Sequence, residues 1–220
     1  VMMATPLDLE DFALGFSLTE AIVDRADDLR VVDCLETADG ISLQMHVPQA
    51  AFDALQLRGR SLTGRTGCGL CGSDTLASAI RPVRRVEGLP ADGARLVASF
   101  EAMQARQPLN ARTGAVHAAA VVAADGRCFV REDVGRHNAI DKAIGAAWRA
   151  GSAPCELFVT SRASYEVVHK AAAAGIGLVA AISAPTALAV RLAGEAGLTL
   201  VGFARDARHT IYAGPHVIPL

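Results

Sequence analysis

The sequence predicts a layered α/β (α+β) fold, in which a smaller α+β unit precedes a larger layered domain. Three observations lead to this prediction. From Gly114 onward, short apolar runs alternate with helical patterns, which is typical of helices that cover a sheet. Hydrophobic residues make up 51% of the 220 residues but aromatic residues only 5%, which indicates a mainly aliphatic core. Near the start, two alternating apolar runs flank Asp39-Gly40, a dipeptide typical of hairpin turns.

The smaller unit is expected over residues 1–65. Residues 1–4 resemble the end of a strand, so we expect residues to be missing upstream. Thr5-Pro6 supplies a capping hydroxyl followed by a proline, which predicts that a helix begins there. The remaining elements of this unit are expected to be strands over 29–35 and 41–47 and a short helix over 48–57.

The larger domain is expected over residues 89–220, behind a mobile loop and linker over 66–88. It begins with a helix over 89–106 and then alternates between strands and helices. The strands are expected over 116–123 (which could begin as a helix), 127–131, 157–160, 178–182, 198–203 and 210–212, and the helices over 138–150, 165–174 and 187–196.

Charge and cysteine content limit the class of protein. A net charge of −2 and a pI of about 6.3 argue against a broad surface for nucleic acid or anionic membrane. No apolar run is long enough to span a bilayer, and no signal peptide is visible. The five cysteines are odd in number and mostly scattered, which favours a reducing, cytoplasmic compartment over a disulfide scaffold.

Cys68 and Cys71 stand in a glycine-rich loop that reads RGRSLTGRTGCGLCG. A CxxC pair can be half of a zinc site, a redox dithiol or a sulfur-carrying nucleophile. No second CxxC or HxxxH completes a zinc site, and the pair does not sit where a strand meets a helix. The nearby Arg58, Arg60 and Arg65 favour the reactive thiolate, although the two cysteines could also be incidental.

The other three cysteines, Cys34, Cys128 and Cys155, lie in or beside predicted strands. A small buried hydrophobic role is the interpretation we prefer for each of them.

Polar turns follow several predicted strands, where ligands bind in layered α/β domains. Ser161-Arg162-Ala163-Ser164 and Ser183-Ala184-Pro185-Thr186 each precede a helix, so they suit either an anion or ordinary helix capping. Arg162 is not explained by capping. The segment from Phe203 to Arg208, FARDAR, supplies arginines that could hold phosphates or merely form a surface turn.

Residues 132–142, EDVGRHNAIDK, concentrate titratable side chains before and within a predicted helix. Arg136, His137 and Asn138 would suit a phosphate or a purine edge, and a solvated helix start is the alternative. His137 and Asp141 are four residues apart and share a helix face. His117 is either a core histidine or a site residue.

Together, these stretches resemble the FdhD family of formate dehydrogenase accessory sulfurtransferases. The resemblance rests on LEDFALGFSLTEAIV, CGLCG, TGAVHAAA, EDVGRHNAIDK, TSRASYEVVHKA, ISAPTALAV and GFARDAR, which occur in order over nearly the whole chain. Each motif alone is weak, but the combination is specific. The strand region that precedes these motifs in the family is absent here, which agrees with the expected truncation.

The resemblance implies a function. Such proteins accept persulfide sulfur from a cysteine desulfurase and pass it to the molybdenum (or tungsten) bis-guanine-dinucleotide cofactor that formate dehydrogenase needs. Cys68 would carry the persulfide, and Cys71 would assist. A homodimer is also implied, and a guanine nucleotide should mimic the cofactor. The segment that binds the cofactor in the family corresponds to Phe203, Ala204, Arg205, Asp206, Ala207 and Arg208; from anion chemistry we add Arg136, His137, Ser161 and Arg162.

The family also implies a cytidine-deaminase-like core. Zinc deaminases use H-x-E and P-C-x-x-C. We match these motifs to His117-Ala118-Ala119 and to the turn from Ser161 to Ser164, which lack the glutamate and both zinc cysteines. No metal is therefore expected. A cofactor-binding chaperone without sulfur chemistry is the main alternative, and a zinc hydrolase is a weaker one. The sequence does not distinguish molybdenum from tungsten or identify the formate dehydrogenase served.

Overall fold

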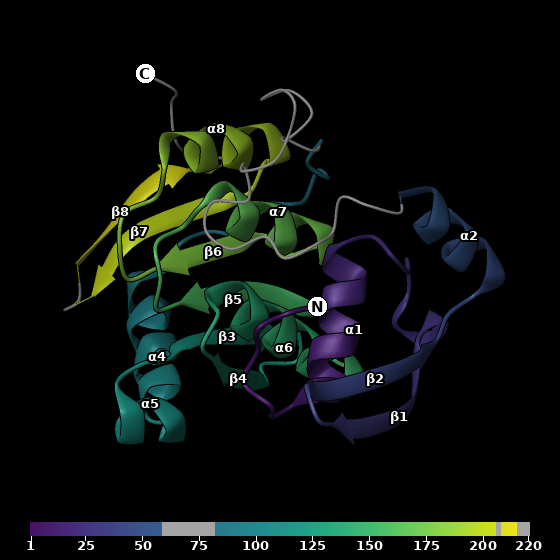
Figure 1. Cartoon of the computed structure of the whole chain (residues 1–220). Helices are drawn as coiled ribbons and strands as arrows, with labels where there is room; N and C mark the ends of the chain where they lie inside the picture. Colours follow the sequence, from purple (N-terminus) through teal and green to yellow (C-terminus); the bar gives the residue numbers. More distant parts are fainter. Residues whose placement is uncertain (59–81, 206–207, 215–220) are drawn as a thin grey trace.

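The computed structural model describes residues 1–58, 82–205 and 208–214 (Figure 1). Four predicted site residues, Cys68, Cys71, Asp206 and Ala207, lie outside the described residues.

A six-stranded mixed sheet forms the centre of the molecule. Its order is β4-β3-β5-β6-β7-β8. The strands β5, β6 and β7 are parallel, whereas β3, β4 and β8 pair antiparallel with their neighbours. The strand bounds are β3 (His117–Ala123), β4 (Cys128–Asp133), β5 (Pro154–Val159), β6 (Leu178–Ala181), β7 (Thr199–Arg205) and β8 (Arg208–Ala213).

Helices cover both faces of this sheet. Because side chains alternate along a strand, Ala119 and Val121 of β3 face one core cluster while Ala118 and Ala120 face the other. The first cluster is covered by α6 (Arg136–Arg149), α7 (Tyr165–Ala173) and α8 (Ala187–Ala196), and the second by α4 (Gly93–Gln104), which α5 (Pro108–Thr113) follows. The layered mixed α/β prediction is confirmed. Its cytidine-deaminase-like detail and the domain boundaries stay predictions.

Helix α1 (Leu9–Thr19) packs against the outer side of α6 (Figure 1). The two backbones meet at Gly15 and Gly145. A Cβ atom on Gly15 would lie 1.7 Å from the Asp141 carbonyl oxygen, and one on Gly145 would lie 1.9 Å from that of Asp11. Only glycine permits such an approach. Helix α1 is therefore joined to the layered domain.

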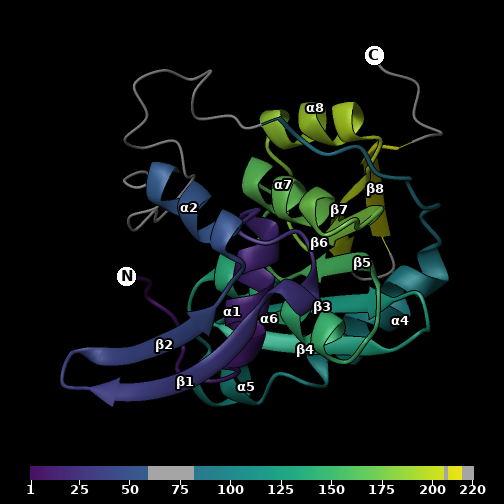
Figure 2. The same cartoon turned by 90° about the vertical axis from the view of Figure 1, so that its right-hand side faces the viewer.

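The rest of the N-terminal region projects from the sheet (Figure 2). It contains a short helix, a two-stranded antiparallel hairpin and a longer helix. The bounds are η1 (Ala26–Asp28), β1 (Arg30–Thr37), β2 (Gly40–His46) and α2 (Gln49–Arg58). The hairpin at Asp39-Gly40 is confirmed. Neither of its faces is covered by the described residues, so Cys34 is exposed and its predicted burial is wrong.

Burial was also overestimated for Cys128 and Cys155, which are only partly buried. Cys128 begins β4 and Cys155 stands second in β5, so both lie near strand starts. The core covers these ends of the strands incompletely.

The predicted helix start at Thr5-Pro6 is wrong, because α1 begins at Leu9. Thr5 is occupied by tertiary bonds instead. Its amide donates to Asp133 Oδ2 at 2.9 Å, and its hydroxyl oxygen accepts from the Val134 amide at 3.0 Å. The Thr5 hydroxyl, which was expected to cap the helix, instead accepts from Val134, and a carboxylate distant in the sequence binds the Thr5 amide.

Two further differences concern the segment before β3. Helix α4 begins at Gly93, after Asp92 caps its first turn, rather than at residue 89. Leu89 lies outside the helix, where its amide donates to the Gly177 carbonyl at 3.2 Å and its carbonyl accepts from the Thr199 hydroxyl at 2.6 Å. Helix α5 was not predicted. Among the described helices, none is long and apolar enough to cross a membrane.

Candidate functional site at one edge of the sheet

The predicted polar turns gather at one edge of the sheet. The carboxyl ends of the parallel strands β5, β6 and β7 lie there. His117 pairs with Asp133, and Ala119 pairs with Val159, so the start of β3 and the end of β4 reach the same edge. The turns that carry Arg136, Ser161, Ser183 and Arg205 therefore follow one another along this edge.

Backbone contacts join neighbouring turns. Ala163 and Pro185 form an isolated parallel bridge, and the Thr186 amide donates to the Ala163 carbonyl at 3.0 Å. The Phe203 amide donates to the Ser183 carbonyl at 3.3 Å. Thr186 also caps α8, as one of the alternatives predicted. The edge is thus a continuous surface from α7 to β7.

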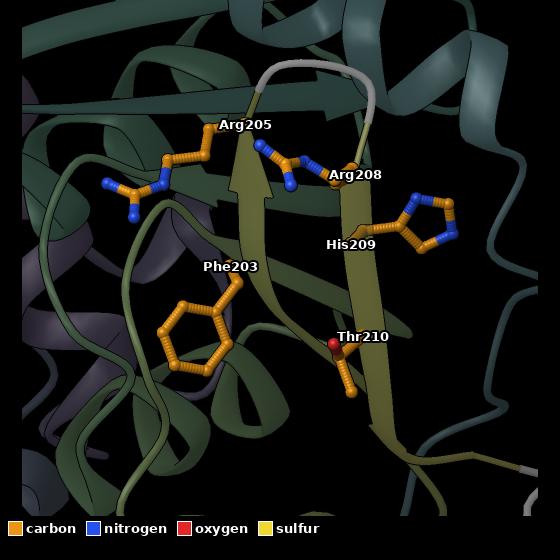
Figure 3. A pocket seen from close by; sticks show the side chains of 5 residues that line it. All are labelled: Phe203, Arg205, Arg208, His209 and Thr210. Atoms are coloured by element: carbon orange, nitrogen blue, oxygen red, sulfur yellow. The ribbon is translucent and has the colours of Figure 1, made fainter.

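Phe203, Arg205 and Arg208 line an open pocket at the end of this surface (Figure 3). The pocket has a volume of about 560 Å³, and its other lining residues are His209 and Thr210. Arg205 and Arg208 are cross-strand partners in the β7–β8 ladder. Two guanidinium groups from facing strands can hold phosphate oxygens. Sequence reasoning missed His209 and Thr210, although a strand continuing directly after Arg208 would have indicated them.

The neighbouring residues of the FARDAR segment differ in their placement. The Ala204 side chain is buried in the core cluster that α4 covers, so only its backbone reaches the edge. Phe203 is 41% exposed and has φ 51°, a conformation that a non-glycine residue rarely adopts. Its ring lies 6.4 Å from that of Tyr212. Strained backbone of this kind is common at ligand sites.

A buried carboxylate shapes the turn between β4 and α6. Asp133 is fully buried and accepts from the Gly135 amide at 2.8 Å, Asn138 Nδ2 at 3.0 Å and Lys142 Nζ at 2.6 Å, besides the Thr5 amide. These bonds fix the turn that presents Arg136 and His137. The charges of residues 132–142 are therefore largely structural, and the solvated helix start is wrong for Asp133, Asp141 and Lys142, which are all buried.

On the same helix, Asp141 faces α1 and α7. It accepts from Thr19 at 2.7 Å and from Lys170 at 2.9 Å. Burial lowers the pKa of Lys170, but attraction to Asp141 and Glu20 outweighs burial and leaves that pKa raised. Lys170 is accordingly a cation that ties the three helices together.

His137 and Glu166 meet at the facing first turns of α6 and α7. His137 Nε2 lies 2.9 Å from Glu166 Oε2, and both side chains are mostly buried. His117 stands nearby at the start of β3 and is partly buried. Burial, followed by electrostatic interaction with the neighbouring Arg136 and His137 side chains, lowers the pKa of His117. His117 is therefore a neutral imidazole at pH 7. Glu166 was not predicted, and nothing in the sequence alone paired it with His137.

The turn after β5 contributes Ser161 and Arg162. The Ser161 side chain is buried, and its hydroxyl donates to the Arg162 carbonyl at 3.0 Å, while Arg162 is exposed. Within the described residues, no three His, Cys, Asp or Glu side chains gather closely enough to hold a metal ion. The described part of the edge is thus cationic and hydroxyl-rich, which suits an anionic ligand.

Comparison with known proteins identifies the family. The model of the FdhD/NarQ family matches residues 1–219. This chain belongs to the FdhD/NarQ family. The predicted resemblance is confirmed over almost its whole length.

Curated relatives and a solved structure agree with this FdhD/NarQ assignment. The sulfur carrier protein FdhD of Xanthomonas euvesicatoria is 54% identical over 100% of this chain and 80% of its own length. The sulfur carrier protein FdhD of Cupriavidus necator is 52% identical over 98% of this chain and 76% of its own length. A crystal structure from Desulfotalea psychrophila, described as a candidate formate dehydrogenase accessory protein, has a TM-score of 0.68 at 24% identity. It covers 97% of this chain and 80% of its own.

Proposed function

We propose that this FdhD/NarQ-family protein is a cytoplasmic sulfur carrier for formate dehydrogenase maturation. It accepts persulfide sulfur from a cysteine desulfurase and delivers it to the molybdenum bis-guanine-dinucleotide cofactor, which is its substrate. Cys68 carries the sulfur as a persulfide, and Cys71 assists the transfer. A homodimer is the proposed assembly. Relatives at 52–54% identity that are called sulfur carrier proteins support the sulfur chemistry.

The pocket at Phe203, Arg205 and Arg208 is the observation that carries the cofactor part of this proposal. A guanine dinucleotide bears a diphosphate, and paired guanidinium groups bind phosphate oxygens through charge-assisted hydrogen bonds. The exposed Phe203 ring offers a face on which a base can stack. This combination of an aromatic face and two cations suits a nucleotide better than it suits a small inorganic anion.

The sulfur part of the proposal is tested by intact-protein mass spectrometry. The wild type and Cys68→Ala are incubated with a cysteine desulfurase and cysteine. We expect the wild type to gain about 32 Da, or multiples of it, and to lose the added mass on reduction, whereas Cys68→Ala should gain none. Cys34→Ala is the matched control, because Cys34 is an exposed thiol on the β1–β2 hairpin, and it should gain sulfur like the wild type.

Absence of added sulfur on the wild type, with an active desulfurase, would contradict the carrier role. A cofactor-binding chaperone would then be the better account, since none of the described residues that line the Arg205–Arg208 pocket is a cysteine.

The cofactor part predicts that Arg205→Ala or Arg208→Ala weakens binding of GDP, used as a mimic of the cofactor ends. Loss of a charge-assisted phosphate contact should reduce the affinity roughly tenfold to hundredfold, while persulfide loading stays unchanged. Isothermal titration calorimetry measures the affinity. The control is Arg191→Ala. Arg191 is an exposed arginine on α8, and its Nε lies 3.8 Å from Glu195 Oε1. Equal affinity in all four proteins would overturn the pocket assignment.

A further inference from the structure

Strand β7 contains a bulge at the edge of the sheet that carries the Arg205–Arg208 pocket. Two cross-strand pairs with β8 flank this bulge: Gly202–Thr210 and Arg205–Arg208. Between these pairs, Phe203 and Ala204 together stand opposite the single residue His209. Bulges of this kind are common beside ligand sites, where they turn a side chain in a new direction.

The bulge turns Phe203 out of the core. Val201 and Ala204 both face the core cluster that α4 covers, although they are three residues apart. Side chains alternate along a regular strand, so an unbulged β7 would place Phe203 on the same side as Val201. Instead, Phe203 is 41% exposed, and its ring lies on the same side of β7 as the Arg205 side chain (Figure 3). The bulge thus presents a large aromatic ring beside the pocket arginines.

The protein keeps this ring exposed in spite of an unfavourable backbone conformation. In one common type of bulge, the first residue is a glycine in the left-handed region. Here Phe203 occupies that position with φ 51°. A bulky side chain disfavours this region, and exposure of the ring gives up part of its hydrophobic stabilisation. Strain of this kind clusters at ligand sites, where it is part of how the site works.

Neighbouring residues hold the Phe203 ring in this position. The Phe203 amide donates to the Ser183 carbonyl at 3.3 Å. The Phe203 ring lies 6.4 Å from the Tyr212 ring, with 43° between the ring planes. Gly202 leaves the necessary space, since a Cβ atom there would lie 2.8 Å from Pro185 Cδ and 2.9 Å from Tyr212 Cε2. The turn after β6 and the Tyr212 ring therefore pack closely against the start of the bulge.

We propose that the bulge in β7 presents Phe203 to the base of the bound guanine nucleotide, and that Tyr212 and Gly202 are its positioning residues. Tyr212 packs against the Phe203 ring and fixes its orientation, and Gly202 leaves the space that the Tyr212 ring needs. The base stacks on the exposed face of Phe203 while Arg205 and Arg208 hold the diphosphate. This inference rests on the proposed binding of the cofactor and adds the residues that orient the aromatic face.

The first test compares two replacements of Phe203. Phe203→Ala and Phe203→Gly both remove the ring, so both should bind GDP roughly tenfold to hundredfold more weakly in isothermal titration calorimetry. Glycine tolerates a φ of 51°, whereas alanine keeps the strain. Phe203→Gly should therefore unfold at a higher urea concentration than Phe203→Ala, the reverse of the order at an ordinary strand position. The matched control is Phe52→Ala, at a 48% exposed phenylalanine on α2, which should bind GDP like the wild type.

The second test asks whether Tyr212 acts through Phe203. Tyr212→Leu removes the supporting ring but keeps an apolar side chain, and it should weaken GDP binding about threefold to tenfold. Tyr212→Phe keeps the ring and should bind GDP like the wild type. Once Phe203→Ala is present, Tyr212→Leu should weaken binding no further, whereas a merely structural effect would weaken it by the same factor in both backgrounds.

Several results would overturn the inference. Wild-type GDP affinity in Phe203→Ala would show that no base stacks on the ring, although the arginine pocket could still bind phosphate. A lower urea midpoint for Phe203→Gly than for Phe203→Ala would show that the bulge does not strain residue 203. Wild-type affinity in Tyr212→Leu, or an equal loss with and without the Phe203 ring, would show that Tyr212 does not position that ring.

Failure of the wild type to bind GDP would overturn this inference together with the cofactor part of the proposed function. Persulfide loading of Cys68 is measured separately, so the sulfur part could still stand in that case.

Discussion

Replacing Lys142 by methionine is expected to lower the free energy of unfolding by about 3–5 kcal/mol, the usual cost of leaving a buried charge without its partner. Lys142 is 0% exposed, and its Nζ donates to Asp133 Oδ2 at 2.6 Å and to the Thr5 carbonyl at 2.8 Å. Methionine keeps most of the side-chain volume, so the loss isolates the ammonium group. Urea unfolding followed by circular dichroism measures the difference.

Two controls define the meaning of that result. Arg191→Met removes a cation from an exposed pair, and it should cost less than about 1 kcal/mol. Asp133→Asn combined with Lys142→Met should be more stable than Lys142→Met alone, because the remaining charge is then removed. A loss below about 1 kcal/mol for Lys142→Met would mean that the ammonium is not needed to hold the N-terminal segment against α6.

The Gly145→Ala substitution should destabilise the protein by roughly 3 kcal/mol, at the upper end of the usual overpacking cost. Alanine ordinarily stabilises a helix relative to glycine by about 1 kcal/mol. Here the new methyl group would lie 1.9 Å from the Asp11 carbonyl oxygen, and backbone cannot rotate away as a side chain can. Helices α1 and α6 must separate, which also disturbs the Asp11 contacts with Arg131 and Arg149.

Gly194 supplies the matched control for this effect. It lies within α8, and a Cβ atom there would meet nothing within 4 Å. Gly194→Ala should therefore raise the free energy of unfolding by about 0.5–1 kcal/mol. The two substitutions should change the free energy of unfolding in opposite directions, and one set of urea titrations measures both changes. A stabilised Gly145→Ala would contradict the close packing of α1 on α6.

The layered domain could be predicted well from periodicity. The expected helix over 187–196 coincides with α8, and the expected strand over 178–182 matches β6 to within one residue. These elements alternate in sequence and bury apolar side chains, so local pattern and tertiary packing agree. Where they disagreed, the prediction failed: Thr5 bonds to Asp133 instead of capping a helix, and Cys34 lies on a hairpin that the described residues leave uncovered.

The candidate site was predicted in part. The sequence placed the polar turns and the arginines of the FARDAR segment at the ends of predicted strands. Their convergence followed from the parallel arrangement of β5, β6 and β7, which brings successive strand ends to one edge. Glu166 and His209 were not predicted as site residues, because each is a single polar residue within its helix or strand and belongs to no recognisable motif. The roles of Cys68 and Cys71 stay predictions, since both residues lie outside the described part of the chain.

The sequence by itself determined the family, the α/β layers and the residue types at the strand ends, because these depend on local pattern and on motifs read in order. Only the tertiary structure decided that Asp133, Asp141, Lys142 and Lys170 are buried structural charges and that His137 faces Glu166. From its sequence, a helix with charged residues on one side is predicted to expose that side to solvent. Helix α1 covers that side of α6 across the Gly15–Gly145 contact, and sequence periodicity alone does not reveal which partner packs there.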